Sequence, residues 1–170
     1  ARGRGNGWGP GGELEMFIKV GRDENNFYLY HAPMNAGSTP AAWTDLAIDF
    51  DRFVDLRRRV QTEYLAGKKE SIACTGVDSA IIAATPLPVG VVSHRFAACE
   101  NGYMVYTVDP AVTAPNLAAV QELAVGMMRV GVGGGTSAIL PSDTLELWVD
   151  DVRLDRPKNA SGVAGQVSMT

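Results

Sequence analysis

Residues Thr144 to Leu154 (TLELWVDDVRL) carry the clearest hydrophobic pattern of the chain. Every second side chain is apolar at first, namely Leu145, Leu147 and Val149. This is the period of a β-strand with one buried face. After the pair Asp150-Asp151 the apolar positions continue at Val152 and Leu154, on the opposite parity. Because a one-residue slip turns every side chain to the other face, we predict a long strand with a β-bulge at the acidic pair, typical of a β-sandwich.

Length and composition favour one globular domain. The chain has 170 residues, of which 46% are hydrophobic and 20% charged, so it can bury a proper core. A net charge of −4 argues against a nucleic-acid-binding protein, which needs a basic surplus. The most apolar run, 80–92, is short and contains Pro86 and Pro88, so we predict no membrane span. The sequence begins at Ala1 without a leader, and we take it as a processed product or a fragment.

We divide the chain into an arm over 1–12, one domain over 13–156 and a polar tail over 157–170. The arm (ARGRGNGWGPGG) is glycine-rich, and such a segment does not repay its ordering entropy alone. It is therefore either a flexible arm or one that orders on a partner. In the second case Trp8 is the anchor, and Arg2 and Arg4 pair with acidic or carbonyl groups of the partner.

Further strands follow from alternation and turn residues. Residues 13–20 and 27–31 alternate around the turn 21–26, which predicts a hairpin. Residues 43–50 (WTDLAIDF) form a third predicted strand. Short strands over 95–99 and 103–108 are joined at Asn101-Gly102, a strong pair for a two-residue hairpin turn.

One helix stands out. From Asp51, the expected N-cap, apolar residues recur every three or four positions until Gly67, which predicts a helix over about 51–66. Arg57, Arg58 and Arg59 lie on it, either as a solvated face or as a patch for acidic groups. We expect 68–79 to be a loop. Residues 116–132 fit a helix or a strand, and we choose a helical turn at Asn116 followed by a strand from about Gln121.

These elements predict a mostly β fold, an antiparallel β-sandwich of jelly-roll type, galactose-binding-like, with one helix. The residues expected to face the core are Leu14, Met16, Ile18, Leu46, Ile48, Phe50, Phe53, Leu56, Val125, Leu145, Leu147, Val149 and Val152.

The two cysteines, Cys74 and Cys99, are either two free buried thiols or a disulfide. A bridge would close a loop of about 25 residues and contribute roughly 3–4 kcal/mol. Neither residue has a second Cys or a His at the spacing of a zinc site.

Other residues with reactive chemistry match no catalytic motif. Ser93 precedes His94, and His31 is the only other histidine, but no nucleophile elbow is present. Residues 131–136 are glycine-rich without the lysine of a phosphate loop, and Asn159-Ala-Ser161 is a formal glycosylation sequon. Five acids are open to a Ca²⁺ interpretation, although their spacing matches no EF-hand: Asp45, Asp49, Asp51, Asp150 and Asp151.

The element order and the ending Leu147–Leu154 (LWVDDVRL) resemble the jelly-roll modules of the SprA family of bacterial cell-surface and outer-membrane secretion proteins. The chain is more distantly similar to galactose-binding-type carbohydrate modules. It also resembles the additional periplasmic subunit of bacterial reaction-centre–light-harvesting complexes. These resemblances imply a structural role without cofactors, outside the cytoplasm and peripheral to a membrane.

We therefore expect a non-catalytic extracytoplasmic module that scaffolds a larger membrane protein complex, a photosynthetic reaction-centre–light-harvesting assembly, through its protein subunits. The alternative is a carbohydrate-binding module, which Ca²⁺ would assist. A glycan-binding face would need Tyr28, Tyr30, Tyr103 and Trp148 on one surface.

Overall fold

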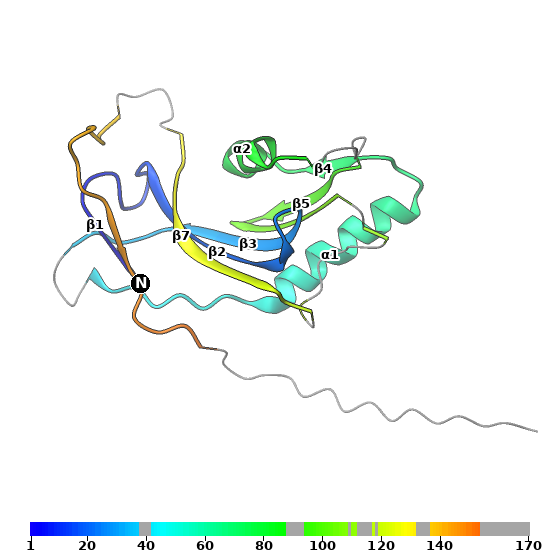
Figure 1. Cartoon of the computed structure of the whole chain (residues 1–170), viewed down its shortest axis with the longest axis horizontal. Helices are drawn as coiled ribbons and strands as arrows, with labels where there is room; N and C mark the ends of the chain where they lie inside the picture. Colours follow the sequence, from blue (N-terminus) through cyan, green and yellow to red (C-terminus); the bar gives the residue numbers. More distant parts are fainter. Residues whose placement is uncertain are drawn as a thin grey trace, which may run out of the picture.

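A computed structural model describes residues 1–37, 42–87, 94–108, 110–111, 117, 119–131 and 137–153. The predicted tail 157–170, the sequon at Asn159, residue Leu154 and most of the glycine-rich stretch 131–136 lie outside these residues. The described part is mostly β, with a six-stranded sheet, a two-stranded sheet and two helices, as Figure 1 shows.

The six-stranded sheet has the order β4-β5-β6-β3-β2-β7. Its strands are β2 (Leu14–Asp23), β3 (Asn26–Pro33), β4 (Ser71–Ala73), β5 (Phe96–Glu100), β6 (Tyr103–Thr107) and β7 (Glu122–Arg129). The two predicted hairpins, β2–β3 and β5–β6, are confirmed. Asn101 and Gly102 both have positive φ, of 52° and 79°, as a tight hairpin turn between twisted strands requires.

The prediction of a purely antiparallel fold is wrong at one edge of this sheet. β4 pairs with β5 in parallel, with Ser71 opposite Phe96. Parallel neighbours need a long crossover, and here it contains the second helix, α2 (Gly76–Ala84).

The sheet is covered on both faces. Helix α1 (Phe50–Leu65) packs on one face, where its Phe53, Leu56 and Val60 form a core cluster with Tyr28 and other sheet residues. Helix α2 lies over the opposite face, where Ile82 packs with Phe27, Leu29 and Tyr106 in a second cluster. The two helices are accordingly seen on opposite sides of the sheet (Figure 1).

Helix α1 confirms the predicted helix with a small shift at its start. Asp49, not Asp51, is the N-cap: its side chain accepts a hydrogen bond from the backbone N–H of Asp51. Phe50 therefore opens the helix and is exposed, although it was expected to face the core. Burial of Phe53 and Leu56 is confirmed.

The predicted strand 43–50 is wrong, although its alternation is real. Leu46 and Ile48 are half-buried against the sheet, whereas Asp45, Ala47 and Asp49 are exposed. The segment from 43 to 49 nevertheless forms no ladder with any described strand. Alternation reports that one side of an extended chain is buried, which does not require a hydrogen-bonded neighbour.

The long bulged strand 144–154 is also wrong. Only β8 (Glu146–Trp148) is a strand, and it pairs with β1 (Arg2–Arg4). Leu145 and Leu147 pack on the sheet as predicted, but Val149 and Val152 are exposed. The chain therefore leaves the core after Trp148, and the parity change at Asp150-Asp151 marks an exit from the sheet instead of a bulge.

The loop predicted for 68–79 contains β4 and the start of α2. Helix α2 is short, and its only fully buried residue is Ile82, so it offers little periodicity to detect. The strand predicted from Gln121 is confirmed as β7, whereas Asn116 lies outside the described residues.

Candidate functional site

The N-terminal arm was expected to be flexible or to order on a partner, and the structure shows that it belongs to the fold. Arg2 pairs with Trp148 and Arg4 with Glu146 in the β1–β8 ladder. The N-terminal ammonium donates to the carbonyl of Thr44 at 2.8 Å, and the N–H of Leu14 donates to the carbonyl of Gly7 at 2.8 Å. The arm is therefore tied at both ends.

Trp8 cannot act as the exposed anchor of this arm. Its side chain is 8% exposed and packs with Leu14, Met16 and Met34 in a third core cluster. Its indole N–H donates to the carbonyl of Arg4 at 3.2 Å. The ordering cost of the arm is offset by the chain's own core, without a partner.

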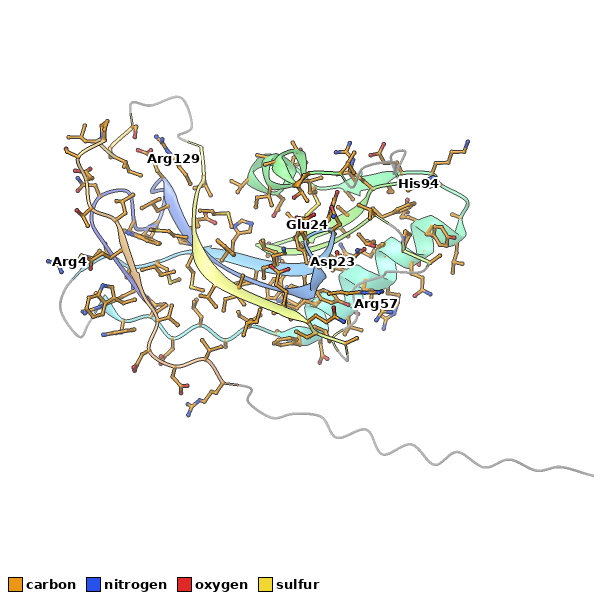
Figure 2. All side chains as sticks on the ribbon, in the orientation of Figure 1. Arg4, Asp23, Glu24, Arg57, His94 and Arg129 are labelled. Atoms are coloured by element: carbon orange, nitrogen blue, oxygen red, sulfur yellow. A yellow bond between two sulfur atoms is a disulfide. The ribbon has the colours of Figure 1, made fainter. Side chains whose placement is uncertain are left out.

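Arg2 is half-buried and Arg4 is exposed, and both lie on what we call the ribbon surface: Arg2, Arg4, Trp43 and Trp148. The guanidinium of Arg2 lies 5.0 Å from the ring centre of Trp43 and 5.1 Å from that of Trp148, within cation–π range of both. Arg4 points outward, with 3.7 Å between its Nη1 and Glu146 Oε2, and lies at the opposite end of the molecule from Arg57 (Figure 2).

The outer part of the ribbon surface is open to solvent. Trp148 is 46% exposed, and its indole N–H donates to Glu146 at 2.7 Å. Val149 follows it and is also exposed. An exposed indole beside arginine side chains has the residue types that are enriched at protein-binding hot spots.

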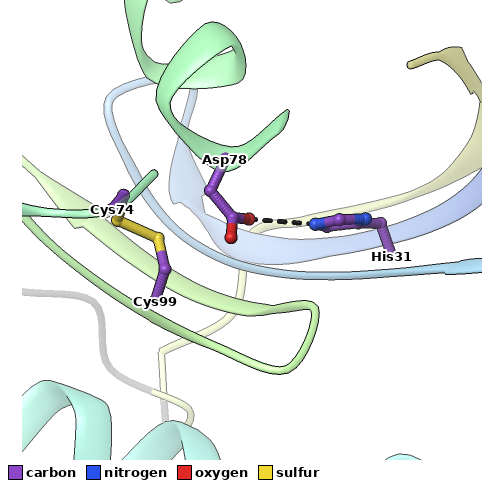
Figure 3. The surroundings of a disulfide bond; sticks show 4 residues. All are labelled: His31, Cys74, Asp78 and Cys99. Atoms are coloured by element: carbon purple, nitrogen blue, oxygen red, sulfur yellow. Dashed lines mark hydrogen bonds and ion pairs between the residues drawn. A yellow bond between two sulfur atoms is a disulfide. The ribbon is translucent and has the colours of Figure 1, made fainter. Parts of the chain in front are cut away.

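His31 belongs to a cluster of buried titratable groups that the sequence analysis does not identify. It lies on β3, beneath α2. Its Nδ1 is bonded to Glu15 of β2, and its Nε2 lies 2.9 Å from Asp78 Oδ1 of α2 (Figure 3). Burial alone would lower the pKa of His31, but the hydrogen bonds and charges of Asp78 and Glu15 outweigh it and raise that pKa. The two carboxylates on either side of the ring thus favour its charged, imidazolium form.

This arrangement makes His31 a link between α2 and the sheet. With both ring nitrogens bonded, the imidazole is not poised to act as a general base or a metal ligand. Glu15 and His31 lie on the same face of the sheet, as the β2–β3 register requires. No local pattern points to Asp78, because the helix that carries it is short and has little hydrophobic periodicity.

Cys74 and Cys99 are joined by a disulfide that ties the residues just before α2 to β5. The bridge lies on the same face of the sheet as the His31–Asp78 bond (Figure 3). Helix α2 is thus attached near its N-terminus by one covalent and one ionic link.

Glu13 is a second buried carboxylate with a structural task. It accepts hydrogen bonds from Arg129 at 2.8 Å, from Ser137 at 2.8 Å and from the N–H of Ala138. Burial opposes ionisation, but these bonds lower the pKa of Glu13 below its usual value. The carboxylate therefore holds the segment that begins at residue 137 against the sheet.

A groove of about 650 Å³ lies between α1 and the β4–β5 edge. Its cations are engaged with acids: Arg58 with Asp55 at 2.7 Å, and Arg59 with Glu100 at 2.5 Å. Arg58 and Arg59 thus form an exposed, charge-balanced helix face.

The remaining predicted candidates do not converge. Tyr28 and Tyr103 are buried in the α1 cluster, whereas Trp148 lies on the ribbon surface, so the four aromatics share no exposed platform. Within the described residues no group of three or more His, Cys, Asp or Glu side chains is placed to hold a metal ion. His94 is exposed and bonded through Nδ1 to the Lys69 carbonyl at 3.0 Å.

The comparisons with known proteins identify no relative. No family model, curated protein or solved structure matches the chain. Among the described helices, none is long and apolar enough to cross a membrane. The fold and the site define a mostly β, disulfide-bonded protein with an aromatic and cationic surface at one end.

Proposed function

We propose that this chain is a non-catalytic, extracytoplasmic module that docks on a larger membrane protein complex and stabilises it. The observation that carries the proposal is the ribbon surface, where exposed Trp148 lies beside Arg2 and Arg4. Tryptophan and arginine are the residue types most enriched among interface hot spots. The docking element is therefore the folded ribbon, in place of a free N-terminal arm.

The extracytoplasmic address is supported by the Cys74–Cys99 disulfide. Such bonds form and persist in oxidising compartments and are rare among cytosolic proteins. The non-catalytic role is supported by His31, whose ring nitrogens are both bonded to carboxylates.

The class of partner rests on the resemblance of the chain to SprA modules and to the periplasmic subunit of reaction-centre–light-harvesting complexes. We propose protein subunits of such a photosynthetic assembly as the partner. We also interpret the six-stranded sheet and the ribbon on its α1 face as the two layers of a jelly-roll-related sandwich.

The carbohydrate-binding alternative is not favoured by the aromatic side chains. A sugar platform needs coplanar exposed rings, whereas two of the four expected tyrosine and tryptophan side chains are core residues.

The test is co-purification with a detergent-solubilised reaction-centre–light-harvesting complex, using the tagged chain with its disulfide intact. Trp148→Ala combined with Arg4→Glu should weaken binding at least about 30-fold, the loss expected for a hot spot worth about 2 kcal/mol. Leu65→Ser is the matched control, because Leu65 is 74% exposed at the far end of α1.

Binding by the wild type and by Leu65→Ser, with loss in the double variant and unchanged melting temperatures, would support the proposal. Failure of the wild type to bind the complex, or equal binding by all three proteins, would contradict it. Tight binding of a glycan by the isolated chain would favour the carbohydrate alternative instead.

A further inference from the structure

Strand β7 forms an edge of the six-stranded sheet. It pairs with β2 over its whole length, from Leu14 opposite Arg129 to Gly21 opposite Glu122. No described strand pairs with its other side. An eight-residue edge carries a row of backbone donors and acceptors able to bind another strand.

The register fixes which residues of β7 present these groups. The N–H of Val130 donates to the carbonyl of Glu13, so the even-numbered residues of β7 bond toward β2. The neighbouring ladder leads to the same parity. The N–H of His31 donates to the carbonyl of Gly102, so the even-numbered residues of β3 form hydrogen bonds with the even-numbered residues of β2. The backbone groups of the odd-numbered residues of β2 are then the ones that bond to β7. The outward backbone groups of β7 therefore belong to Leu123, Val125, Met127 and Arg129, which we call the β7 edge.

Three of the four side chains of the β7 edge are apolar and at least partly accessible, and the fourth, Arg129, is bonded to Glu13. Leu123 is 59% exposed and Met127 is 40% exposed, with half-buried Val125 between them. Natural edge strands are usually protected by proline, by an inward lysine or by a bulge. The strand ELAVGMMR has no proline or lysine, and its pairing with β2 is regular from end to end. Within the part of the chain that the structure describes, this edge is open to strand addition.

The pattern on the β7 edge is symmetric about Val125. In an antiparallel pair of two β7 strands with Val125 opposite Val125, Leu123 of each copy faces Met127 of the other. All outward backbone groups between residues 123 and 127 then meet in hydrogen-bonded pairs. The two neighbouring registers of the same parity place Leu123 opposite Arg129 or Met127 opposite Gln121, so only the first sets apolar side chains opposite one another throughout. Self-complementarity in the first register points to a second copy of this chain as the occupant.

We infer that two copies of this protein associate through their β7 edges, in antiparallel register centred on Val125, and form one continuous sheet across a two-fold axis. The pairing covers Leu123 and Met127 of both copies and satisfies the edge backbone. This association uses the sheet edge and is independent of the ribbon surface.

The test compares charge variants whose effect depends on the register. Leu123→Lys with Met127→Lys places two lysines opposite each other in each half of the pair, which disfavours association. Leu123→Lys with Met127→Glu places opposite charges in those positions. Molar mass is measured by light scattering after gel filtration over a range of concentrations, and by sedimentation equilibrium.

The wild type, the Lys/Glu variant and the control Leu65→Lys should be dimeric at high concentration, and the Lys/Lys variant monomeric. At concentrations where the wild type is monomeric, melting temperatures should be alike, because the altered side chains are exposed. A wild type that stays monomeric at every concentration overturns the inference. A dimer that persists in the Lys/Lys variant also overturns the inference. If both charge variants are equally monomeric, the proposed register is wrong.

Discussion

Trp8 should be essential to stability, although it lies in a glycine-rich arm. Replacement by alanine removes a side chain that packs against Leu14, Met16 and Met34. A buried tryptophan removes about 200 Å² from water, which at about 25 cal/mol per Å² is worth about 5 kcal/mol. Because alanine keeps part of this contact and the arm can relax, we expect a loss of about 3–5 kcal/mol in the free energy of unfolding.

The assay is urea denaturation followed by circular dichroism, which does not depend on the tryptophan that is removed. For a chain of this size a loss of about 3 kcal/mol lowers the melting temperature by about 6–12 °C. Trp148→Ala is the matched control, since that side chain is nearly half exposed, and it should cost less than about 1 kcal/mol. Deletion of residues 1–12 should destabilise the protein at least as much as Trp8→Ala.

Gly3 provides an independent check on the same contact. A Cβ at Gly3 would overlap the indole ring of Trp8, so Gly3→Ala should cost about 1–3 kcal/mol. In the Trp8→Ala background that cost should largely vanish, which a double-mutant cycle measures. If Trp8→Ala and Trp148→Ala have equal, small effects, the arm does not belong to the core and the reasoning is refuted.

Two further predictions concern the links that hold α2. Replacing both Cys74 and Cys99 with serine should lower the free energy of unfolding by about 3.5 kcal/mol, the value for a closed loop of 25 residues. Reduction of the wild type should cause the same loss in urea titrations. Equal stability of the oxidised and reduced proteins would contradict this prediction. For His31 the pKa is raised in the folded state, so its stabilisation is fully present below the ordinary pKa of 6.5 and is lost as the pH rises through the folded value. The advantage of the wild type over His31→Gln in urea should therefore shrink as the pH rises above about 6.5, and an advantage that grows with pH would contradict the imidazolium assignment.

The elements that the sequence predicts well are those whose signals are local. Asn101-Gly102 dictates a tight turn by its backbone preferences alone, so β5 and β6 were found with nearly correct bounds. The spacing of Phe53, Leu56 and Val60 identifies α1, because only a helix brings these positions onto one face. In both cases the information lies within a few residues.

The predicted strands that are wrong arise where an alternating hydrophobic pattern indicates burial of one side of the chain, which is not evidence of hydrogen bonding to a neighbouring strand. Leu46 and Ile48 alternate because an extended segment lies across the sheet, and Leu145 and Leu147 because a short strand does. Whether such a segment joins a ladder depends on which other strand is available beside it. That is a property of the whole topology, which no window of the sequence contains.

The candidate sites show the same contrast between what local sequence indicates and what only the whole fold determines. Cys74 and Cys99 could be named as possible partners, since the chain has only two cysteines, but the sequence also leaves two free thiols open. The link from His31 to Asp78 spans 47 positions and depends on a helix with little periodicity. Residue type therefore suggested which groups could interact, and the fold decided which of them meet.

The arm shows why composition alone misleads. Glycine-rich sequence lowers the tendency to order, and that argument assumes that glycine contributes nothing to the folded state. Here Gly3 leaves room for the ring of Trp8, and Gly7, at a φ of +86°, turns the chain so that its carbonyl accepts the N–H of Leu14. These glycines are what allow a large aromatic side chain to fold back into the core within a few residues. A single tryptophan in such a segment is therefore evidence for docking, and the surface on which it docks can belong to the same chain.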